Sequence, residues 1–296
     1  MQCVSPSLIH TAQGPMRVPC NRCMACRINK GQEWSLRVLY ELETNGNKGC
    51  FATLTFDPEY EPPDGSLRKK DLQNFNKRVR KYFFGNGKSE YKYYACGEYG
   101  PKTFRPHYHV AMLGIDIPFS EWVFVRMENG KPVYTSPTLS KLWPYGFNTI
   151  GFLEKASINY VTGYIQKKMF GKEAKLYKDL GVIPPFQLYS QGLGVGFVME
   201  QSDRILDNGF VSWYGKKMPI PKYYSRKIGL QDQVTEEGVN LRSQLAYDSQ
   251  DEAMREWMEK TGKSEFEYAE YLISARLQKK LDMAAKEKIV QSRSKL

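Results

Sequence analysis

The chain has 296 residues, enough for a sizeable hydrophobic core, and its 43 basic residues outnumber its 32 acidic ones, for a formal charge of +11. This basic balance, with 14% aromatic residues, is typical of soluble proteins that bind polyanions. No apolar run approaches the about 20 residues that cross a bilayer, and the first residues lack a signal-peptide pattern, so we expect no membrane partner.

Hydrophobic periodicity predicts alternating helices and strands. Apolar residues recur at helical spacing over residues 28–43, after Ser66 to about residue 83, and over 155–170, whereas strand patterns cover 51–57, 91–96 and 107–113. Ser66 is the expected N-cap of the second helix. This order predicts an α+β fold with a largely antiparallel sheet.

The second half of the chain has a different composition. Residues 155–230 carry 12 basic and 5 acidic side chains, and the part from 173 onward is rich in glycine, proline and aromatic residues. Residues 245–290 have the pattern of one or two charged helices. The basic excess is therefore concentrated in the middle of the chain.

A histidine pair marks one predicted strand. His107 and His109 are two of only three histidines, and the two-residue period of a strand places both on one face of the sheet. Two neutral imidazoles form half of a divalent-metal site and need an oxygen ligand from a neighbouring element. Glu98, just past the preceding predicted strand, is the expected ligand, with Asp57 as the alternative. The competing interpretation is a chance pair on an exposed strand.

A tyrosine pair marks the predicted helix that follows. Tyr160, Tyr164 and Lys167 fall within about 60° of one another, opposite Ile158 and Val161, which supply a core face. A phenol, with a pKa of about 10, becomes a nucleophile only beside positive charge. A metal on the histidine pair would provide that charge, with Lys167 adding to it. The competing interpretation is that the tyrosines pack in the core.

The N-terminal segment contains closely spaced cysteines. Cys20, Cys23 and Cys26 are each separated by two residues, and Cys3 and His10 lie upstream as possible fourth ligands. Structural zinc prefers four tetrahedral ligands, so a site completed by Cys3 is expected. An iron–sulfur cluster and free or redox-active thiols are the alternatives.

Three further features are expected to be structural. Cys50 and Cys96 lie on predicted strands and are interpreted as small core residues. Residues 87–89 read Gly-Lys-Ser but lack the other glycine of a phosphate-binding loop and follow a helix, so we predict a turn. No built-in helicase is expected.

The segments FATLTFD, RPHYHVAML and YVTGYIQKK, in this order, resemble the three motifs of the HUH endonuclease superfamily, specifically its two-tyrosine rolling-circle replication initiators. Over residues 1–230 the chain resembles the replication initiators of microviruses of the gokushovirus type. The resemblance implies an RRM-like antiparallel sheet of about five strands with flanking helices, followed by a helical C-terminal tail.

The resemblance also implies an activity and a set of roles. It makes His107, His109 and Glu98 ligands of Mg²⁺ or Mn²⁺, and Tyr160 and Tyr164 the nucleophiles with Lys167 one turn later. The implied enzyme nicks single-stranded origin DNA, leaves a 5′-phosphotyrosine and a free 3′-OH, and rejoins the strand. Its implied partners are single-stranded or supercoiled phage origin DNA, a host helicase and a host DNA polymerase, in the cytoplasm of the host bacterium.

Two other classes of function stay open: a non-catalytic nucleic-acid-binding regulator with a structural metal, and a related relaxase or transposase. The expected organisation has four parts. These are a Cys-rich segment and helix (1–46), an HUH endonuclease domain (47–172), a basic, aromatic and glycine-rich extension packing on it (173–230), and a charged helical tail (231–296).

Overall fold

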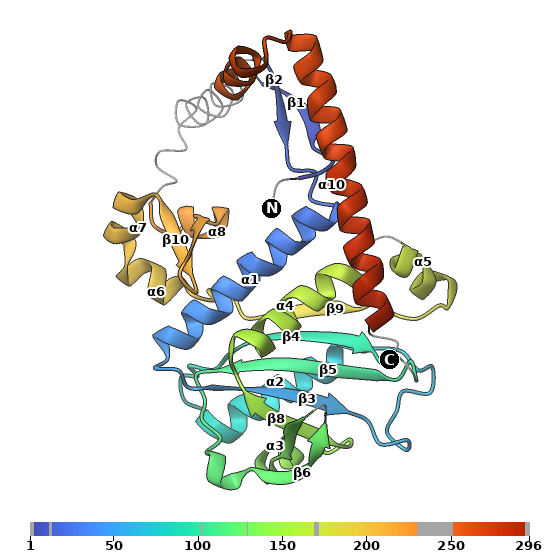
Figure 1. Ribbon diagram of the computed structural model, residues 1–296. Coiled ribbons are helices and arrows are strands. Elements are labelled where there is room, and N and C mark those ends of the chain that lie inside the picture. The colour runs from blue at the N-terminus through green and yellow to red at the C-terminus, as the bar shows by residue number, and fades with distance from the viewer. Residues whose placement is uncertain are drawn as a thin grey trace. The chain divides into compact units, whose positions relative to one another are not determined.

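The computed structural model describes residues 3–11, 14–101, 103–128, 130–168, 172–229 and 251–293. The chain divides into two compact units, one formed by Lys30–Tyr224 and the other by Met1–Asn29 together with Ser225–Leu296. Helix α1 (Met24–Thr44) begins in the second of these units and continues in the first (Figure 1). The four-part division expected from the sequence stays a prediction.

The larger unit is built around a seven-stranded sheet in which neighbouring strands are antiparallel. In spatial order the strands are β6 (Val123–Glu128), β7 (Lys131–Thr135), β8 (Asn148–Phe152), β3 (Gly49–Thr55), β5 (Pro106–Leu113), β4 (Lys92–Tyr99) and β9 (Phe186–Tyr189) (Figure 1). The predicted α+β fold with an antiparallel sheet is confirmed. The expected number of about five strands is corrected to seven.

The strands that had no sequence signal lie at the two edges of the sheet. All six residues of β6 are exposed, and Val123, Phe124 and Val125 form an unbroken apolar run, so no alternation reveals a strand. The β6–β7 hairpin turns through Gly130, whose φ of 74° is in the left-handed region. Strand β9 has four residues in the glycine- and proline-rich part of the chain. Edge strands of this kind are held by pairing rather than by burial of one face.

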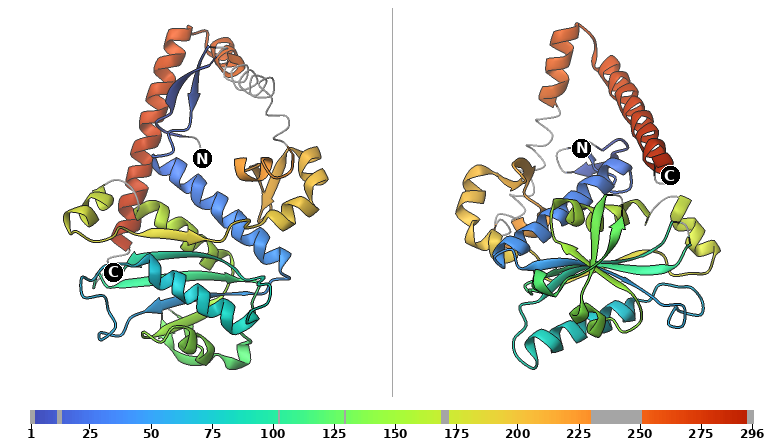
Figure 2. Two further views of the ribbon diagram at one scale, coloured as in Figure 1. Left: turned by 180° about the vertical axis from the view of Figure 1, so that it is seen from behind. Right: turned by 60° about the horizontal axis from the view of Figure 1, so that its bottom comes forward.

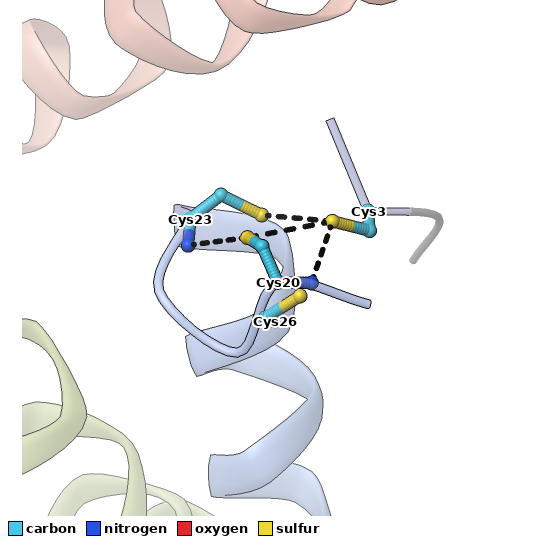
Figure 3. A group of neighbouring side chains, drawn as sticks. All are labelled: Cys3, Cys20, Cys23 and Cys26. Carbon is cyan, nitrogen blue, oxygen red and sulfur yellow. Dashed lines mark hydrogen bonds between the residues drawn. The ribbon is translucent and has the colours of Figure 1, made fainter. Parts of the chain in front are cut away.

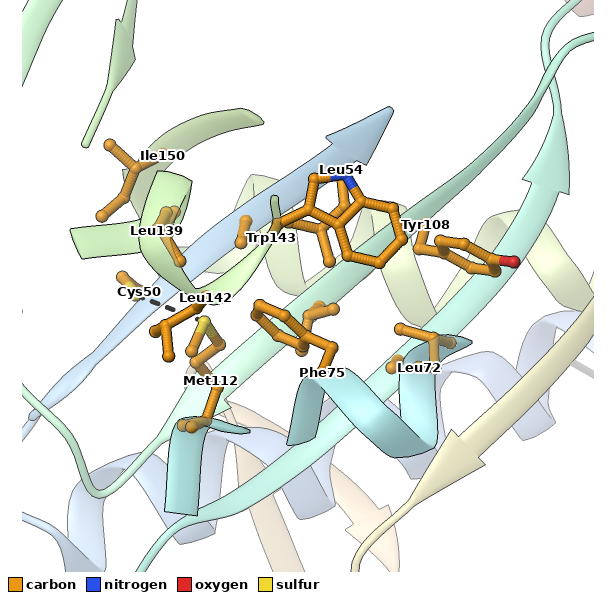
Figure 4. Close-up of a cluster of buried hydrophobic side chains, with 14 of the residues drawn as sticks. Cys50, Leu54, Leu72, Phe75, Tyr108, Met112, Leu139, Leu142, Trp143 and Ile150 are labelled. Atoms are coloured by element: carbon orange, nitrogen blue, oxygen red, sulfur yellow. Dashed lines mark hydrogen bonds between the residues drawn. The ribbon is translucent and has the colours of Figure 1, made fainter. Parts of the chain in front are cut away.

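One face of the sheet is covered by α2 (Lys69–Phe84) and α3 (Pro137–Leu142). Every second residue of β3 points into this core, including Cys50, Ala52 and Leu54, all buried. Phe75 of α2 packs its ring against Trp143, with ring centroids 6.3 Å apart (Figure 4). The predicted core role of Cys50 is thereby confirmed.

The opposite face carries a second core, formed with α1 and α4 (Lys155–Lys168) (Figure 2). Trp34 and Val38 of α1 and Ile158 and Val161 of α4 are buried there. Cys96 of β4 belongs to the same cluster, which confirms its predicted core role. The two helices cover this face only in part, and the functional side chains lie beside them.

Helix α2 begins later than expected. Its N-cap is Arg68, whose side chain makes no capping hydrogen bond, so the predicted cap at Ser66 is wrong. The Ser66 hydroxyl instead accepts a hydrogen bond from the amide of Ile183 at 2.9 Å, because the chain stays extended until Arg68. Residues 87–89 lie in the irregular connection after α2, as predicted.

The remaining elements are short, apart from one long helix. Within the larger unit they are η1 (Phe119–Glu121), α5 (Lys172–Asp179), α6 (Val195–Glu200), α7 (Ser202–Asn208), β10 (Phe210–Trp213) and β11 (Lys216–Pro219). α8 (Lys222–Ser225) ends at the boundary of the two units. The smaller unit contains the hairpin β1 (Ser7–Thr11) and β2 (Gly14–Val18), a helix over residues 251–261, and α10 (Glu265–Arg293). Among the described helices, none is long and apolar enough to cross a membrane.

Candidate active site

The histidine pair lies on β5, and both side chains are on the sheet face that carries α4. In the strand register, His107 is opposite Glu98 of β4 and His109 is opposite Cys96. The two imidazole rings lie 5.0 Å apart and nearly perpendicular to each other. Glu98 lies within β4 and not past the end of a strand, which corrects the expected position and explains why it faces the pair directly.

One carboxylate oxygen of Glu98 joins both histidines. Glu98 Oε1 lies 2.9 Å from Nε2 of His107 and 2.9 Å from Nε2 of His109. Burial alone raises the pKa of Glu98, but the hydrogen bonds and positive charge of the two imidazoles outweigh it and hold the pKa well below its usual range. The carboxyl group is therefore ionised at neutral pH.

Further contacts orient the two imidazoles. Thr53 Oγ1 of β3 lies 2.9 Å from His109 Nδ1, and the ring of Phe51 stacks on that imidazole at 5.6 Å. His107 Nδ1 lies 3.3 Å from the Arg105 carbonyl oxygen. Since a carbonyl only accepts, Nδ1 of His107 carries a proton, and in the neutral ring Nε2 is then the nitrogen with a free lone pair. This is the arrangement that a metal-ligating histidine adopts.

The three side chains fit a divalent cation. Their ligand atoms all lie within 4.8 Å of one another, and the set combines two imidazole nitrogens with an ionised carboxylate. Such a mixed nitrogen and oxygen set suits first-row divalent ions including Mn²⁺. Asp57, the alternative third ligand, is not part of this cluster; its backbone amide bonds the Tyr145 carbonyl oxygen at 2.9 Å.

Tyr160 brings a phenol to this cluster. Its Oη donates a hydrogen bond to Glu98 Oε1 at 3.0 Å and lies 3.4 Å from His109 Nε2. The side chain is 41% exposed, whereas Ile158 and Val161 on the same helix are completely buried. The prediction that the aliphatic side chains form the core face while the tyrosine points away from it is confirmed for these residues.

The other two predicted residues of the helix are described only by their backbone. Positions 164 and 167 belong to α4, and the side chains of Tyr164 and Lys167 lie outside the described part of the chain. Their expected roles stay predictions. The structure thus brings together Glu98, His107, His109 and Tyr160 of the predicted set.

Helix α4 is held against α1 by buried polar contacts. Ser35 Oγ lies 2.6 Å from Thr162 Oγ1 and donates to Asn159 Oδ1 at 2.9 Å. At the same crossing, a Cβ added to Gly31 would lie 3.2 Å from the Cα of Gly163. The close approach of the two backbones fixes the height of α4 above the sheet, and with it the position of Tyr160.

Sequence reasoning missed the residues that support the site. Phe51 and Thr53 lie on the predicted strand FATLTFD, where the two-residue period shows that they share a face. Whether that face meets the histidines depends on the pairing of β3 with β5, which places Thr53 opposite His109. No signal in the sequence specifies this register.

The predicted cysteine ligands also come together, in the smaller unit. The sulfur atoms of Cys3, Cys20, Cys23 and Cys26 all lie within 4.8 Å of one another, as Figure 3 shows. None of the four forms a disulfide. His10, the alternative fourth ligand, is not part of this cluster.

Comparison with known proteins relates the chain to one family. The model of a family of replication-associated proteins, the ORF2 family, matches residues 49–169, a span that includes the cluster around Glu98 and all of α4. Replication-associated protein ORF2 of Spiroplasma virus 4 is 34% identical over 219 residues, which cover 71% of this chain and 67% of that protein.

Two further relatives agree with this match. Replication-associated protein VP4 of Bdellovibrio phage phiMH2K is 30% identical over 70% of this chain and 65% of its own length. Replication-associated protein ORF4 of Chlamydia phage 1 is 25% identical over 73% of this chain and 55% of its own length. No solved structure matches the chain. The chain belongs to the ORF2 family of replication-associated proteins.

Proposed function

We propose that the chain is a replication initiation endonuclease that cuts one strand of phage origin DNA through a tyrosine and later rejoins it. The observation that carries this proposal is the distance of 3.0 Å between Tyr160 Oη and Glu98 Oε1, because it puts a phenol on a cluster of metal-ligand type. Membership of a replication-associated family supports a role in DNA replication. Paired phenols beside a metal are not needed by a non-catalytic binding protein, which uses aromatic rings for stacking.

We infer that Glu98, His107 and His109 hold Mg²⁺ or Mn²⁺. When bound, the cation supplies Lewis-acid activation of the scissile phosphate and neutralises part of its charge. Because the pKa of Glu98 is held well below its usual range, its carboxylate is a weak base. It serves as a ligand and as the acceptor that orients the Tyr160 hydroxyl, not as the group that takes up the phenol proton.

The reaction is a transesterification. Tyr160 Oη attacks the phosphorus atom, so a bond forms between Oη and phosphorus while the bond between phosphorus and O3′ breaks. The phenol releases one proton to solvent and the departing O3′ takes one up, which leaves a 5′-phosphotyrosine and a free 3′-OH. No water or ATP is consumed, and a later attack by a 3′-OH on the phosphotyrosine restores the DNA strand.

Tyr164 is proposed as the second nucleophile, for the cut that ends a round of synthesis, and Lys167 as a positive charge beside the phosphates. Their support is the motif YVTGYIQKK and their place on the same helix as Tyr160. One turn of helix separates the two tyrosines, so both phenols start from the same side of α4. The free 3′-OH is a primer for a host polymerase.

DNA is expected to approach the face of the sheet that carries α4. The basic helix α2 packs on the other face, and two of its charges are engaged there. The guanidinium of Arg78 lies over the ring of Tyr145, and that of Arg80 lies over the ring of Tyr91. Since the sequence contains no phosphate-binding loop, we propose that a host helicase separates the strands, in the cytoplasm of the host bacterium.

The proposal is tested with single-stranded oligonucleotides that tile the replicon encoding the chain, incubated with the full chain and Mn²⁺ and resolved under denaturing conditions. A 5′-phosphotyrosine stays on the 3′ part of the cut strand. A 3′ label should therefore shift to a protein-bound band, whereas a 5′ label should appear on a shorter free product. A protein that binds the DNA without forming either species would be a binding regulator and not a nickase.

Variants assign the residues. Tyr160→Phe should lower adduct formation strongly, and adding Tyr164→Phe should abolish it. Glu98→Gln, which keeps the shape of the side chain but removes its charge, should abolish the dependence on Mn²⁺. Tyr82→Phe is the matched control, because Tyr82 is 52% exposed on α2 at the opposite face. An adduct that survives in the double tyrosine variant would show that the nucleophile lies elsewhere.

A further inference from the structure

Four cysteine sulfurs gather from two parts of the smaller unit. Cys3 precedes the β1–β2 hairpin, whereas Cys20, Cys23 and Cys26 lie in the turn that leads into α1 and in its first turn (Figure 3). Cys3 Sγ is 3.5 Å from Cys20 Sγ and 3.7 Å from Cys23 Sγ. We propose that these four thiolates bind one structural Zn²⁺, and this proposal is independent of the proposed nickase activity.

The spacing of the sulfurs matches tetrahedral zinc. With a bond of about 2.3 Å between zinc and each sulfur, the sulfurs of a regular tetrahedron lie about 3.8 Å apart. The distances of 3.5 and 3.7 Å are close to this value, and all four sulfurs lie within 4.8 Å of one another. A four-iron cluster puts each thiolate on a separate iron and therefore needs a wider spacing.

The backbone around the cluster is arranged to receive thiolates. The amide of Cys20 donates to Cys3 Sγ at 3.3 Å, and the amide of Cys23 donates to Cys20 Sγ at 3.3 Å. Asn21, between these cysteines, has a φ of 57°, a left-handed conformation that asparagine tolerates better than most residues. The tight turn brings the Cys23 amide back to the Cys20 sulfur. Amide donors of this kind orient metal ligands and stabilise their charged form.

The N-terminal segment also lacks another source of stability. Among the described residues from 3 to 29, the buried hydrophobic side chains are only Val4, Ala25 and Cys26, while Leu8 and Ile9 of β1 are exposed. A two-stranded hairpin is marginally stable by itself in water. A metal that joins Cys3, before the hairpin, to Cys20, after it, closes this segment, and its binding free energy then contributes to folding.

The first measurement is the metal content of the purified full chain, produced with zinc supplied and kept under reducing conditions, by plasma mass spectrometry. We expect one zinc ion per chain at this site and no stoichiometric iron. Cys20→Ser and Cys23→Ser should each lose this zinc, and Cys50→Ser, a buried cysteine of the other unit, should keep it. Because the His107→Ala variant should also keep it, zinc held at the candidate active site is distinguished from zinc held by the cysteines.

A second measurement uses the wild-type chain and so does not depend on whether a cysteine variant folds. Titration with a mercurial thiol reagent should release the zinc in step with the modification of four thiols, and Co²⁺ exchanged into the chain should give the intense visible bands of tetrahedral thiolate coordination. Stoichiometric iron, a chain without zinc, or a zinc ion released without thiol modification would each overturn the proposal.

Discussion

Helix α1 crosses α4 at a pair of glycines, and Gly31→Ala tests whether this crossing sets the position of Tyr160. A Cβ at Gly31 would lie 3.2 Å from Gly163 Cα and 3.4 Å from the Thr162 carbonyl oxygen. Ordinary van der Waals contacts of a Cβ lie at 3.4–4 Å, so the α4 backbone must shift by a few tenths of an ångström. Because backbone atoms form the contact, the shift carries Tyr160 with it.

Two opposing terms set the stability of this variant. Replacing glycine by alanine inside a helix stabilises it by about 1 kcal/mol, whereas overpacking costs about 1–3 kcal/mol. We therefore expect the free energy of unfolding of Gly31→Ala to fall by about 0–2 kcal/mol. The matched variant is Gly163→Ala, whose Cβ would meet nothing within 4 Å, and its free energy of unfolding should rise by up to about 1 kcal/mol. Chemical denaturation measures both.

The effect on chemistry should be larger than the effect on stability. A misplacement of 1 Å costs about 100-fold in rate, so a shift of a few tenths of an ångström should slow adduct formation by about 3- to 10-fold. The affinity for Mn²⁺ should not change, because Glu98 and the histidine pair lie on the sheet. The assay is the single-turnover rate of adduct formation with saturating DNA and metal. A wild-type rate in Gly31→Ala, or weaker Mn²⁺ binding, would refute this reasoning.

Further changes have defined outcomes. Thr53→Val removes the hydroxyl beside His109 Nδ1 and should weaken Mn²⁺ binding by about 10- to 100-fold in calorimetry, whereas Thr55→Val, whose hydroxyl bonds the carbonyl oxygen of residue 147, should not; equal effects would contradict the orienting role. Phe75→Ala should lower the free energy of unfolding by about 3–5 kcal/mol, and Phe75→Leu by clearly less. Burial and nearby negative charge raise the pKa of Cys50 to about 12, so iodoacetamide at pH 8 should label it only after denaturation, and rapid labelling in the native chain would be inconsistent with this burial.

The parts of the site that depend on local periodicity were predictable. The alternation of β5 put His107 and His109 on one face, and the helical period of α4 separated Tyr160 from the buried side of its helix. What the sequence could not supply is the register between strands. A slip of one residue between β4 and β5 would move Glu98 to the other face of the sheet, so its place opposite His107 comes from the tertiary fold.

The same distinction explains the other differences. The β6–β7 hairpin has no buried face, so its residues carry no alternation that a strand prediction could use. The start of α2 at Lys69 instead of after Ser66 follows from a long-range contact, the hydrogen bond from the Ile183 amide to the Ser66 hydroxyl. The meeting of Cys3 with Cys20 was expected from the number of ligands that zinc needs, and the β1–β2 hairpin between them makes it possible.

The central claim is that the Tyr160 hydroxyl attacks DNA beside a metal held by Glu98 and the histidine pair. The most direct test is mass spectrometry of the covalent adduct after nuclease and protease digestion. The account predicts a nucleotide linked through its 5′-phosphate to Tyr160, or to Tyr164 in molecules that have made the second cut, and none without a divalent cation. A nucleotide on another tyrosine, a link through the 3′-phosphate, or cleavage without any covalent adduct would contradict it.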